Sequence, residues 1–341
     1  MKVFVKTYGC TLNQKDGEII KGVLNKSNFT LVESEEEADI IVINSCGVKS
    51  VTENKIISYI KSQTKPVYLG GCLTKMIDTS KLNVKGIFDT NTISKLPEQI
   101  KNNIKNNLSA EKEEKLSLPS IQSKENITII PISEGCLGDC NYCSVKFARG
   151  RLKSYKIEDI LKQVKGKKVL LTSQDTGCYG LDINTNLINL LKQVVQVEGD
   201  FEIRVGMMNP EHVLPILKDL VEIYKNKKIF KFIHIPIQSG SNKVLKEMNR
   251  RYTVEDFKEI VKEFRKQIPE IHISTDIIVG YPTETEEDFK QTINLLETLK
   301  LEIVNLSKFA PRQRTVAKKL KQLSNEEIKR RSIILTKIIK F

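Results

Sequence analysis

The sequence predicts an α/β protein in which an N-terminal parallel-sheet domain is followed by a partial (β/α)6 barrel. Short β-branched runs alternate with amphipathic stretches, which is typical of βα units and parallel sheets. The runs form two series, separated by a polar stretch without clear periodicity. A length of 341 residues with 40% hydrophobic content allows a large core and favours two domains over one.

The first series predicts an N-terminal domain over residues 1–105, with strands near 3–7, 40–44, 67–69 and 86–88. The polar stretch 106–126 is predicted to be a linker. The second series, over 127–311, contains six candidate strands: 127–132, 168–172, 201–205, 230–235, 272–279 and 302–308. Six βα units predict a partial barrel whose reaction face is formed by the loops after the strands. Residues 325–341 are predicted to form a terminal helix within a basic tail, 312–341.

The composition indicates a cytoplasmic protein without membrane contact. No apolar run approaches the ~20 residues that span a bilayer, and the N-terminus lacks the pattern of a signal peptide. Seven cysteines in a chain without an export signal fit metal ligation in a reducing compartment better than a disulfide framework.

The net charge of +13 is unevenly distributed. The tail 312–341 holds ten Lys or Arg against two Glu, a net +8, so the other 311 residues contribute only +5. A second basic cluster consists of Lys146, Arg149, Arg151, Lys153 and Lys156. Both are predicted to face phosphate, with an ordinary solvated basic surface as the alternative for each residue.

Cys10, Cys46 and Cys72 are far apart in sequence, but each comes just after a predicted strand. Strand ends meet at one edge of a parallel sheet, and ligands of such sheets bind there. We therefore expect these three thiols to converge on one metal centre. The alternative is that they are small buried hydrophobes, which would place them inside strands rather than in Gly-flanked turns.

Cys136, Cys140 and Cys143 form a CxxxCxxC motif in EGCLGDCNYCSVKFARG. Three thiolates at this spacing can hold three irons of a cube and leave the fourth iron open to a cosubstrate. A structural zinc knuckle is the alternative, although no second CxxC or HxxxH lies nearby. The spacing, with Tyr142 before the last cysteine, resembles the radical S-adenosylmethionine (SAM) enzymes. Cys178 is left over and is interpreted as an ordinary, partly buried thiol.

The motifs TYGCTLNQKD, INSCGVK and GGCL, followed by the SAM motif, resemble the methylthiotransferase family of radical SAM enzymes over nearly the whole chain. The resemblance implies two 4Fe-4S clusters, one on Cys136, Cys140 and Cys143 and an auxiliary one on Cys10, Cys46 and Cys72 whose open iron carries sulfur. It also implies that a 5′-deoxyadenosyl radical from SAM activates the substrate carbon. Asn13 and Asp16 occupy family-like positions where they would order the first cysteine loop.

Polar residues at the predicted barrel strand ends are candidates to bind SAM. Their motifs resemble those of the family, although such residues also close loops and cap helices. Asp175 and Arg204 are the preferred pair for the SAM ammonium and carboxylate. The three histidines show no ligand spacing and are assigned no chemistry. The candidates are Ser173, Gln174, Asp175, Arg204, Gln238 and Ser239, with Asp276 and Thr285 as further strand-end residues.

The segment CLGDCNYCSVKFARGRLKSY looks most like the archaeal and eukaryotic branch, which converts N6-threonylcarbamoyladenosine 37 of tRNA to its 2-methylthio derivative. The resemblance implies the tRNA anticodon loop, an external electron donor and a sulfur donor as partners. The alternatives are another tRNA adenosine, a ribosomal protein, or a non-catalytic iron-sulfur RNA-binding module. The chain ends at Phe341 without room for the TRAM domain usual in the family, so we expect the basic tail to share in tRNA capture.

Overall fold

The computed structural model describes residues 1–47 and 50–339. Val48 and Lys49, within the motif INSCGVK, and Lys340 and Phe341, at the end of the predicted terminal helix, lie outside the described residues. The chain forms two compact units, each described by itself: Met1–Cys136 with Ser144–Lys167, and Leu137–Cys143 with Lys168–Phe341.

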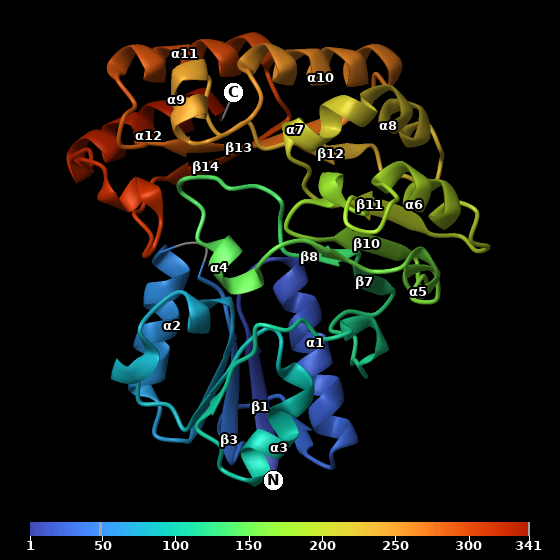
Figure 1. The fold of residues 1–341 in the computed structure, drawn as a ribbon, viewed down its shortest axis with the longest axis vertical. Helices are drawn as coiled ribbons and strands as arrows, with labels where there is room; N and C mark the ends of the chain where they lie inside the picture. The colour runs from blue at the N-terminus through green and yellow to red at the C-terminus, as the bar shows by residue number, and fades with distance from the viewer. Residues whose placement is uncertain (48–49, 340–341) are drawn as a thin grey trace. The chain divides into compact units, whose positions relative to one another are not determined.

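The first unit is built on a six-stranded parallel sheet in the order β2-β1-β3-β4-β5-β6 (Figure 1). The chain runs outward from β1 to β2 and then returns to pair β3 with β1 on its other side. This is a doubly wound order, and its switch point lies between β1 and β3. The strands are β1 (Lys2–Thr7), β2 (Thr30–Val32), β3 (Ile40–Ser45), β4 (Val67–Gly71), β5 (Gly86–Phe88) and β6 (Asn106–Asn107).

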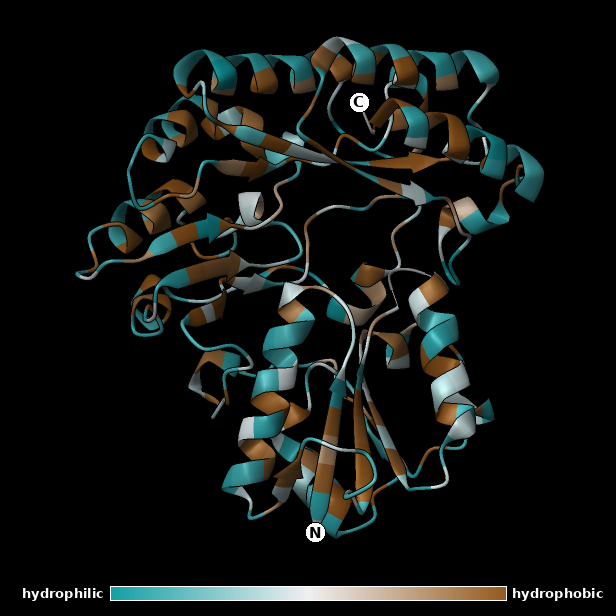
Figure 2. Cartoon of the chain, turned by 180° about the vertical axis from the view of Figure 1, so that it is seen from behind, coloured by the Kyte–Doolittle hydropathy of each residue, from teal (hydrophilic) through white to brown (hydrophobic). Residues whose placement is uncertain are grey.

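Helices cover both faces of this sheet because its central strands are apolar on both sides, as their brown colour in Figure 2 shows. Helices α1 (Thr11–Lys26) and α3 (Leu96–Lys101) share one core with the sheet, and α2 (Ser50–Ser62) shares a second core on the opposite face. The predicted strands of this domain are therefore confirmed, and so is the α/β layering.

The prediction that residues 106–126 form a linker is wrong. The segment begins with strand β6 of the sheet, and Lys115, in a 3₁₀ turn (Lys115–Ser117), is 1% exposed. Further along, the Ile121 N–H donates to the Glu18 carbonyl and the Ser123 N–H donates to the Glu18 carboxylate. The segment packs through isolated residues, the buried Lys115 and the partly buried Leu118, rather than through a continuous apolar face, which is why its sequence lacks periodicity.

The first unit also contains the residues on both sides of the CxxxCxxC loop. Ser133 of β8 pairs with Ser154 of β9 in an antiparallel ladder, and the helix α4 lies between these strands in sequence. The elements of this part are β7 (Ile127–Pro131), β8 (Ser133–Glu134), α4 (Val145–Arg149), β9 (Lys153–Ser154) and α5 (Ile157–Leu161).

The second unit carries the remaining parallel strands, with β10 paired to β11 and β12-β13-β14 forming a sheet. An isolated parallel bridge, Ile203 to Ile229, continues the order from β11 toward β12. The strands are β10 (Lys168–Thr172), β11 (Glu202–Val205), β12 (Phe232–His234), β13 (His272–Val279) and β14 (Ile303–Lys308). Five of the six predicted barrel strands are thus found here at or near their predicted bounds.

Helices follow each of these strands, and α10 and α11 run along the sheet in Figure 1. Both begin with a capping box, Thr253 with Asp256 and Thr285 with Asp288, so each start is fixed by side-chain hydrogen bonds. The helices are α6 (Leu187–Val194), α7 (Pro210–Val213), α8 (Leu217–Tyr224), α9 (Asn242–Glu247), α10 (Val254–Gln267), α11 (Glu286–Leu299) and α12 (Asn325–Ile339). Among the described residues, none of the helices has the length and apolarity to cross a bilayer.

Helix α12 confirms the predicted terminal helix but corrects the interpretation of its charge. Arg331 is 4% exposed and bonds the Glu284 carboxylate at 2.8 Å and Glu327 at 2.6 Å. Neighbouring Arg330 pairs with Glu327 at 2.8 Å. The prediction that the whole tail faces phosphate is therefore wrong for Arg331, because the helix needs a cation on its buried side to balance Glu284.

Candidate metal centres

The three dispersed cysteines follow three adjacent strands. Cys10 comes after β1, Cys46 after β3, and Cys72 directly after β4, and the sheet order places these strands side by side. The loops therefore meet at the carboxyl edge of the sheet, at and beside the switch point, where doubly wound folds bind their ligands.

Two glycines permit this close approach. Gly9 has a φ of +113°, and a Cβ there would lie 3.0 Å from Cys46 Sγ. Gly71 has a φ of +89°, and a Cβ there would lie 2.4 Å from the Ser45 carbonyl oxygen. Both backbones need the left-handed region and both positions lack room for a side chain. The glycines of YGC and GGC thus bring the cysteine loops together.

Asn13, in the first turn of α1, joins the three loops. Its side-chain amide donates to the carbonyls of Tyr8 and Ser45, each at 2.9 Å, and its Oδ1 accepts from Cys72 Sγ at 3.6 Å. Asn44 in turn donates to the Asn13 carbonyl at 2.7 Å. The predicted ordering role of Asn13 is confirmed, since this buried amide spans the ends of β1, β3 and β4.

Arg149 of α4 contacts the same centre. Its Nε donates to Cys72 Sγ at 3.2 Å, and its Nη2 donates to Asn13 Oδ1 at 2.7 Å and to Asp16 Oδ2 at 2.5 Å. The prediction that Arg149 belongs to a phosphate-facing patch is wrong, because its side chain is 1% exposed. A buried guanidinium needs carboxylate partners, and Asp16 supplies one.

Two cations and two carboxylates form this buried network. Lys115 bonds Asp16 at 2.7 Å and Glu134 at 2.5 Å, and Arg149 lies 3.7 Å from Glu134. All four side chains are at most 2% exposed, so each charge is balanced within the network. Burial raises the pKa of Asp16, but Arg149 and Lys115 outweigh it and hold that pKa below its usual range.

The thiol of Cys72 is kept from solvent and lies beside a cation. Burial raises its pKa to about 11, and the Arg149 guanidinium opposes that rise by favouring the thiolate. Binding of a metal would displace this proton.

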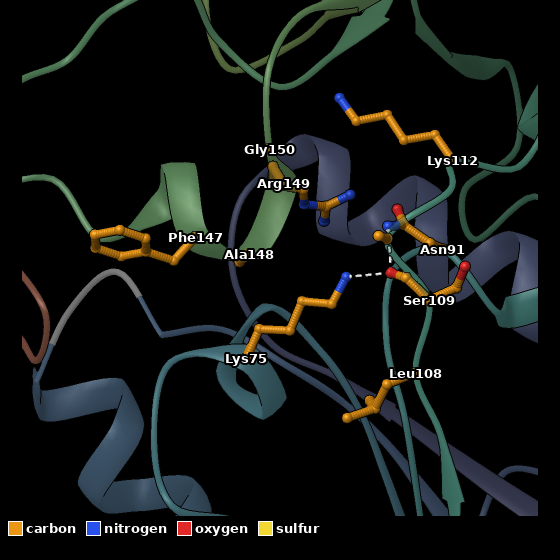
Figure 3. A pocket seen from close by; sticks show the side chains of 10 residues that line it. Lys75, Asn91, Leu108, Ser109, Lys112, Phe147, Ala148, Arg149 and Gly150 are labelled. Atoms are coloured by element: carbon orange, nitrogen blue, oxygen red, sulfur yellow. Dashed lines mark hydrogen bonds between the residues drawn. The ribbon is translucent and has the colours of Figure 1, made fainter.

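A cavity of about 420 Å³ adjoins Arg149 in the first unit (Figure 3). Its two lysines are already bonded: Lys75 to Asp89 and the Ser109 carbonyl, and Lys112 to the Glu134 carbonyl. Burial lowers the pKa of Lys112 to about 8. The walls include Lys75, Asn91, Leu108, Lys112, Phe147 and Arg149.

The CxxxCxxC loop is anchored separately in the two units. In the first unit, the Cys136 N–H donates to the Gly150 carbonyl at 3.3 Å, next to Arg149. In the second, Asn141 is the main anchor of the loop. Its N–H donates to the Met248 carbonyl at 3.0 Å, its side chain donates to the Glu247 carbonyl at 2.7 Å, and its own carbonyl accepts from Ala317. Residues at the end of α9 thus fix the loop that carries Cys140 and Cys143.

Arg250 donates a hydrogen bond to Cys140 as Arg149 does to Cys72, and no motif in the sequence indicated this contact. Its Nη1 donates to Cys140 Sγ at 3.2 Å, and its Nη2 donates to Asn209 Oδ1 at 2.8 Å and to the Pro236 carbonyl at 3.2 Å. The Nε donates to the Tyr252 hydroxyl at 2.7 Å. The donor set of this loop therefore suits a charged cluster with sulfur acceptors.

Asp175, the preferred acceptor for SAM, is 1% exposed and has both carboxylate oxygens engaged. Oδ1 accepts from the N–H groups of Gly177 and Asn209, and Oδ2 lies 2.7 Å from His212 Nδ1. Burial lowers the pKa of His212, but the Asp175 carboxylate outweighs it and raises that pKa. These three side chains, Asp175, Cys178 and His212, have ligand atoms within 4.8 Å of one another. Their mutual hydrogen bonds account for this grouping.

Arg204, its predicted partner, is exposed and stacks 4.4 Å above the Phe232 ring. Asp175 is buried and already hydrogen-bonded, whereas Arg204 is exposed and stacked on an aromatic ring, so the two do not form a pair of free polar groups. Ser173 accepts from the Asp175 N–H, Ser239 accepts from the Ser241 N–H, and Gln238 adopts a φ of +75° beside β13. Of the further strand-end residues, Asp276 lies 3.1 Å from His234 and Thr285 caps α11. The SAM contacts of all these residues remain predictions.

Two family models match the chain, "Radical SAM superfamily" over residues 130–296 and "Uncharacterized protein family UPF0004" over residues 2–90. A relative from Methanocaldococcus jannaschii, named probable threonylcarbamoyladenosine tRNA methylthiotransferase, is 43% identical over 99% of this chain and 82% of its own length. The chain belongs to this family of radical SAM methylthiotransferases. A Thermosipho africanus relative, named tRNA-2-methylthio-N(6)-dimethylallyladenosine synthase, is 38% identical over 93% of this chain and 78% of its own.

Among solved structures, the chain is similar to the radical SAM methyltransferase TsrM from Kitasatospora setae. The TM-score is 0.68 at 13% identity, and the match covers 93% of this chain and 74% of that one. This likeness confirms the predicted fold class, an α/β domain followed by a radical SAM domain. Family membership implies a 4Fe-4S cluster and SAM, to which the donor set of the CxxxCxxC loop is suited.

Proposed function

We propose that this enzyme converts N6-threonylcarbamoyladenosine 37 of tRNA to its 2-methylthio derivative, using two 4Fe-4S clusters. One cluster is held by Cys136, Cys140 and Cys143, and the other by Cys10, Cys46 and Cys72. The observation that carries the proposal is the convergence of three cysteine loops on the switch point of the first sheet. Nothing in a SAM-cleaving centre alone requires a second set of thiolates.

The two clusters and SAM would supply radical activation of a carbon without an acidic hydrogen, and the sulfur to be installed. The chain's own residues hold these groups in place. Asn13 and the two glycines fix the auxiliary cysteine loops, while Asn141 and Arg250 fix the SAM-cluster loop. The Cys136 N–H donates to the carbonyl of Gly150, and the preceding residue, Arg149, donates to the Cys72 sulfur. The segment Arg149–Gly150 of the first unit therefore contacts one cysteine of each motif.

A second candidate substrate is a tRNA adenosine with a different N6 group. The Thermosipho relative, whose name specifies dimethylallyladenosine, is only slightly less identical to this chain than the Methanocaldococcus relative. The motif CLGDCNYCSVKFARG favours the threonylcarbamoyl substrate, and tRNA, an electron donor and a sulfur donor are the proposed partners.

Reconstitution under anaerobic conditions tests the two-cluster proposal. The protein is expected to bind about eight irons, four per cube, and to release 5′-deoxyadenosine from SAM after reduction. Mass analysis of nucleosides should show 2-methylthio-N6-threonylcarbamoyladenosine only in tRNA treated with enzyme. A product on dimethylallyladenosine instead would establish the second candidate. Modification of ribosomal protein alone, or no SAM cleavage, would reject both.

The basic tail is proposed to contribute to tRNA capture, excluding the buried Arg331. If about six tail charges touch phosphate, the logarithm of affinity should fall with that of salt concentration at a slope on the order of −4. Neutralising the exposed Lys318, Lys319 and Lys321 should make this slope shallower by about 2. A matched triple change of Lys258, Lys262 and Lys266 on α10 is the control. An equal effect of both sets would show only general charge attraction.

A further inference from the structure

Each cysteine motif has one arginine that donates to a cysteine sulfur at 3.2 Å. Hydrogen bonds to cluster sulfurs and nearby positive charge both favour the reduced form of a cluster, which carries one more negative charge. The two arginines are equivalent in this contact. They differ in what balances their charge.

At the auxiliary motif the positive charge is neutralised. Arg149 bonds Asp16 at 2.5 Å, and the second cation of the network, Lys115, bonds Asp16 and Glu134. The side chains are at most 2% exposed, so solvent screens these interactions little. Within this buried network two cations face two carboxylates, and their charges sum to zero; Lys112, which donates to the Glu134 carbonyl, lies at the edge of the network.

At the SAM motif the positive charge is not neutralised. Arg250 bonds an amide oxygen, a backbone carbonyl and the Tyr252 hydroxyl, and none of its contacts among the described residues is a carboxylate. Asp175 is connected to Arg250 through Asn209: the Asn209 N–H donates to the Asp175 carboxylate, which is also paired with His212. Glu211 faces the exposed Arg251. The Cys140 sulfur therefore has a neighbouring cation whose charge no carboxylate cancels.

We propose that this difference directs the incoming electron to the SAM cluster and keeps the auxiliary cluster oxidised. The inference rests on the two clusters of the proposed function. Cys136, Cys140 and Cys143 would hold the cube that accepts this electron, and an external one-electron donor would supply it by losing one electron, so that the cube would pass from the 2+ to the 1+ state. Arg250 and Arg149 act as positioning residues that set the order in which the two cubes accept that electron.

The test is a redox titration of the reconstituted full chain, followed by electron paramagnetic resonance. Each cluster is observed alone, in chains with the other triad changed from Cys to Ala. Asp16→Asn leaves Arg149 unbalanced and should increase the reduced-to-oxidised ratio of the auxiliary cluster about tenfold, a shift of about 59 mV for one electron. The double change Arg149→Met with Asp16→Asn removes both charges and should leave that ratio within about threefold of wild type.

At the SAM cluster, Arg250→Met should decrease the reduced-to-oxidised ratio at least tenfold. Arg250→Lys, which keeps the charge, should retain most of the wild-type ratio. Arg251→Met is the matched control, since this neighbouring arginine is exposed and pairs with Glu211. An unchanged auxiliary potential in Asp16→Asn, or equal shifts in Arg250→Met and Arg251→Met, would overturn the inference. Wild-type protein that takes up about four irons, or does not cleave SAM, would instead contradict the proposed function.

Discussion

The two proposed cluster sites are built from their cysteines in opposite ways. The CxxxCxxC triad is local, since one loop supplies all three thiols and its spacing alone indicates the cluster. The auxiliary triad comes from three loops that the sheet order β1-β3-β4 brings together. The geometry of a local site depends on the contacts that anchor its loop, whereas the geometry of a dispersed site depends on the fold of the whole sheet. The auxiliary centre should therefore be the more sensitive to changes in the scaffold.

The largest expected effect separates the two centres by function. Cys72→Ala should reduce bound iron from about eight to about four and abolish methylthiolation, while release of 5′-deoxyadenosine from SAM continues. Cys140→Ala should lose the same amount of iron and abolish SAM cleavage as well. Iron analysis and product chromatography measure both. Loss of SAM cleavage in Cys72→Ala would show that the centres are not separable. Cys178→Ala, which changes a buried cysteine outside both triads, is the control.

The sequence predicted the strands of both units and the two triads because these follow from local pattern. Runs of β-branched residues give strands wherever they occur, and thiols after strands share an edge in any parallel sheet. Predicted bounds 168–172 and 272–279 match β10 and β13.

The supporting network was missed because its members are distant in sequence. Arg149 lies in a basic run, which is typical of an exposed surface, yet its ion-pair partner Asp16 is 133 residues away in the sequence. One signal was available: Asp16 lies four residues after Leu12 and three before Ile19, on the buried stripe of α1. A carboxylate on that stripe requires a buried cation. The sequence does not say which cation, so neither Lys115 nor Arg149 was identifiable.

The next effect compares the asparagines that anchor the two motifs. Asn13→Ala removes the side-chain donor to the Tyr8 and Ser45 carbonyls and one acceptor of the Arg149 guanidinium, and should cost about 3 kcal/mol of unfolding free energy. Asn141→Ala removes one side-chain hydrogen bond and should cost about 1 kcal/mol. Urea denaturation of the metal-free proteins measures both. Asn25→Ala, on the exposed face of α1, is the control. Equal costs would contradict the greater scaffold dependence of the dispersed site.

A smaller effect concerns the glycine that lets the β4 loop approach β3. Gly71→Ala introduces a Cβ 2.4 Å from a backbone oxygen at a φ of +89° and should destabilise the first unit by about 2 kcal/mol. Auxiliary-cluster iron should fall with it. Gly199→Ala also requires a positive φ, but its Cβ would meet nothing closer than 3.6 Å. It should cost less and leave the iron content unchanged. Equal iron loss in both variants would show that close approach of the loops is not the cause.

The smallest effect is a pH dependence that His212 contributes on the SAM-cluster side. The auxiliary network stays charged near neutrality, since Asp16 has a lowered pKa and Arg149 a raised one. On the other side, the pKa of His212 is raised above 6.5 in the folded protein because Asp175 outweighs burial. Its contribution to stability is therefore complete below the unfolded pKa and is lost as pH rises through the folded one. Wild type should exceed His212→Gln in unfolding free energy by more at pH 5.5 than at pH 8.5.

The control for this pH dependence is His272→Gln, the matched change at a histidine that is exposed at the start of β13. Denaturation of the metal-free proteins removes any titration of cluster ligands from the comparison. A difference between wild type and His212→Gln that grows with pH would reverse the sign expected from a raised pKa. It would also mean that Asp175 does not favour the imidazolium. In that case the Asp175 carboxylate would lack a cationic partner, and its negative charge, linked through Asn209 to Arg250, would oppose the charge of Arg250.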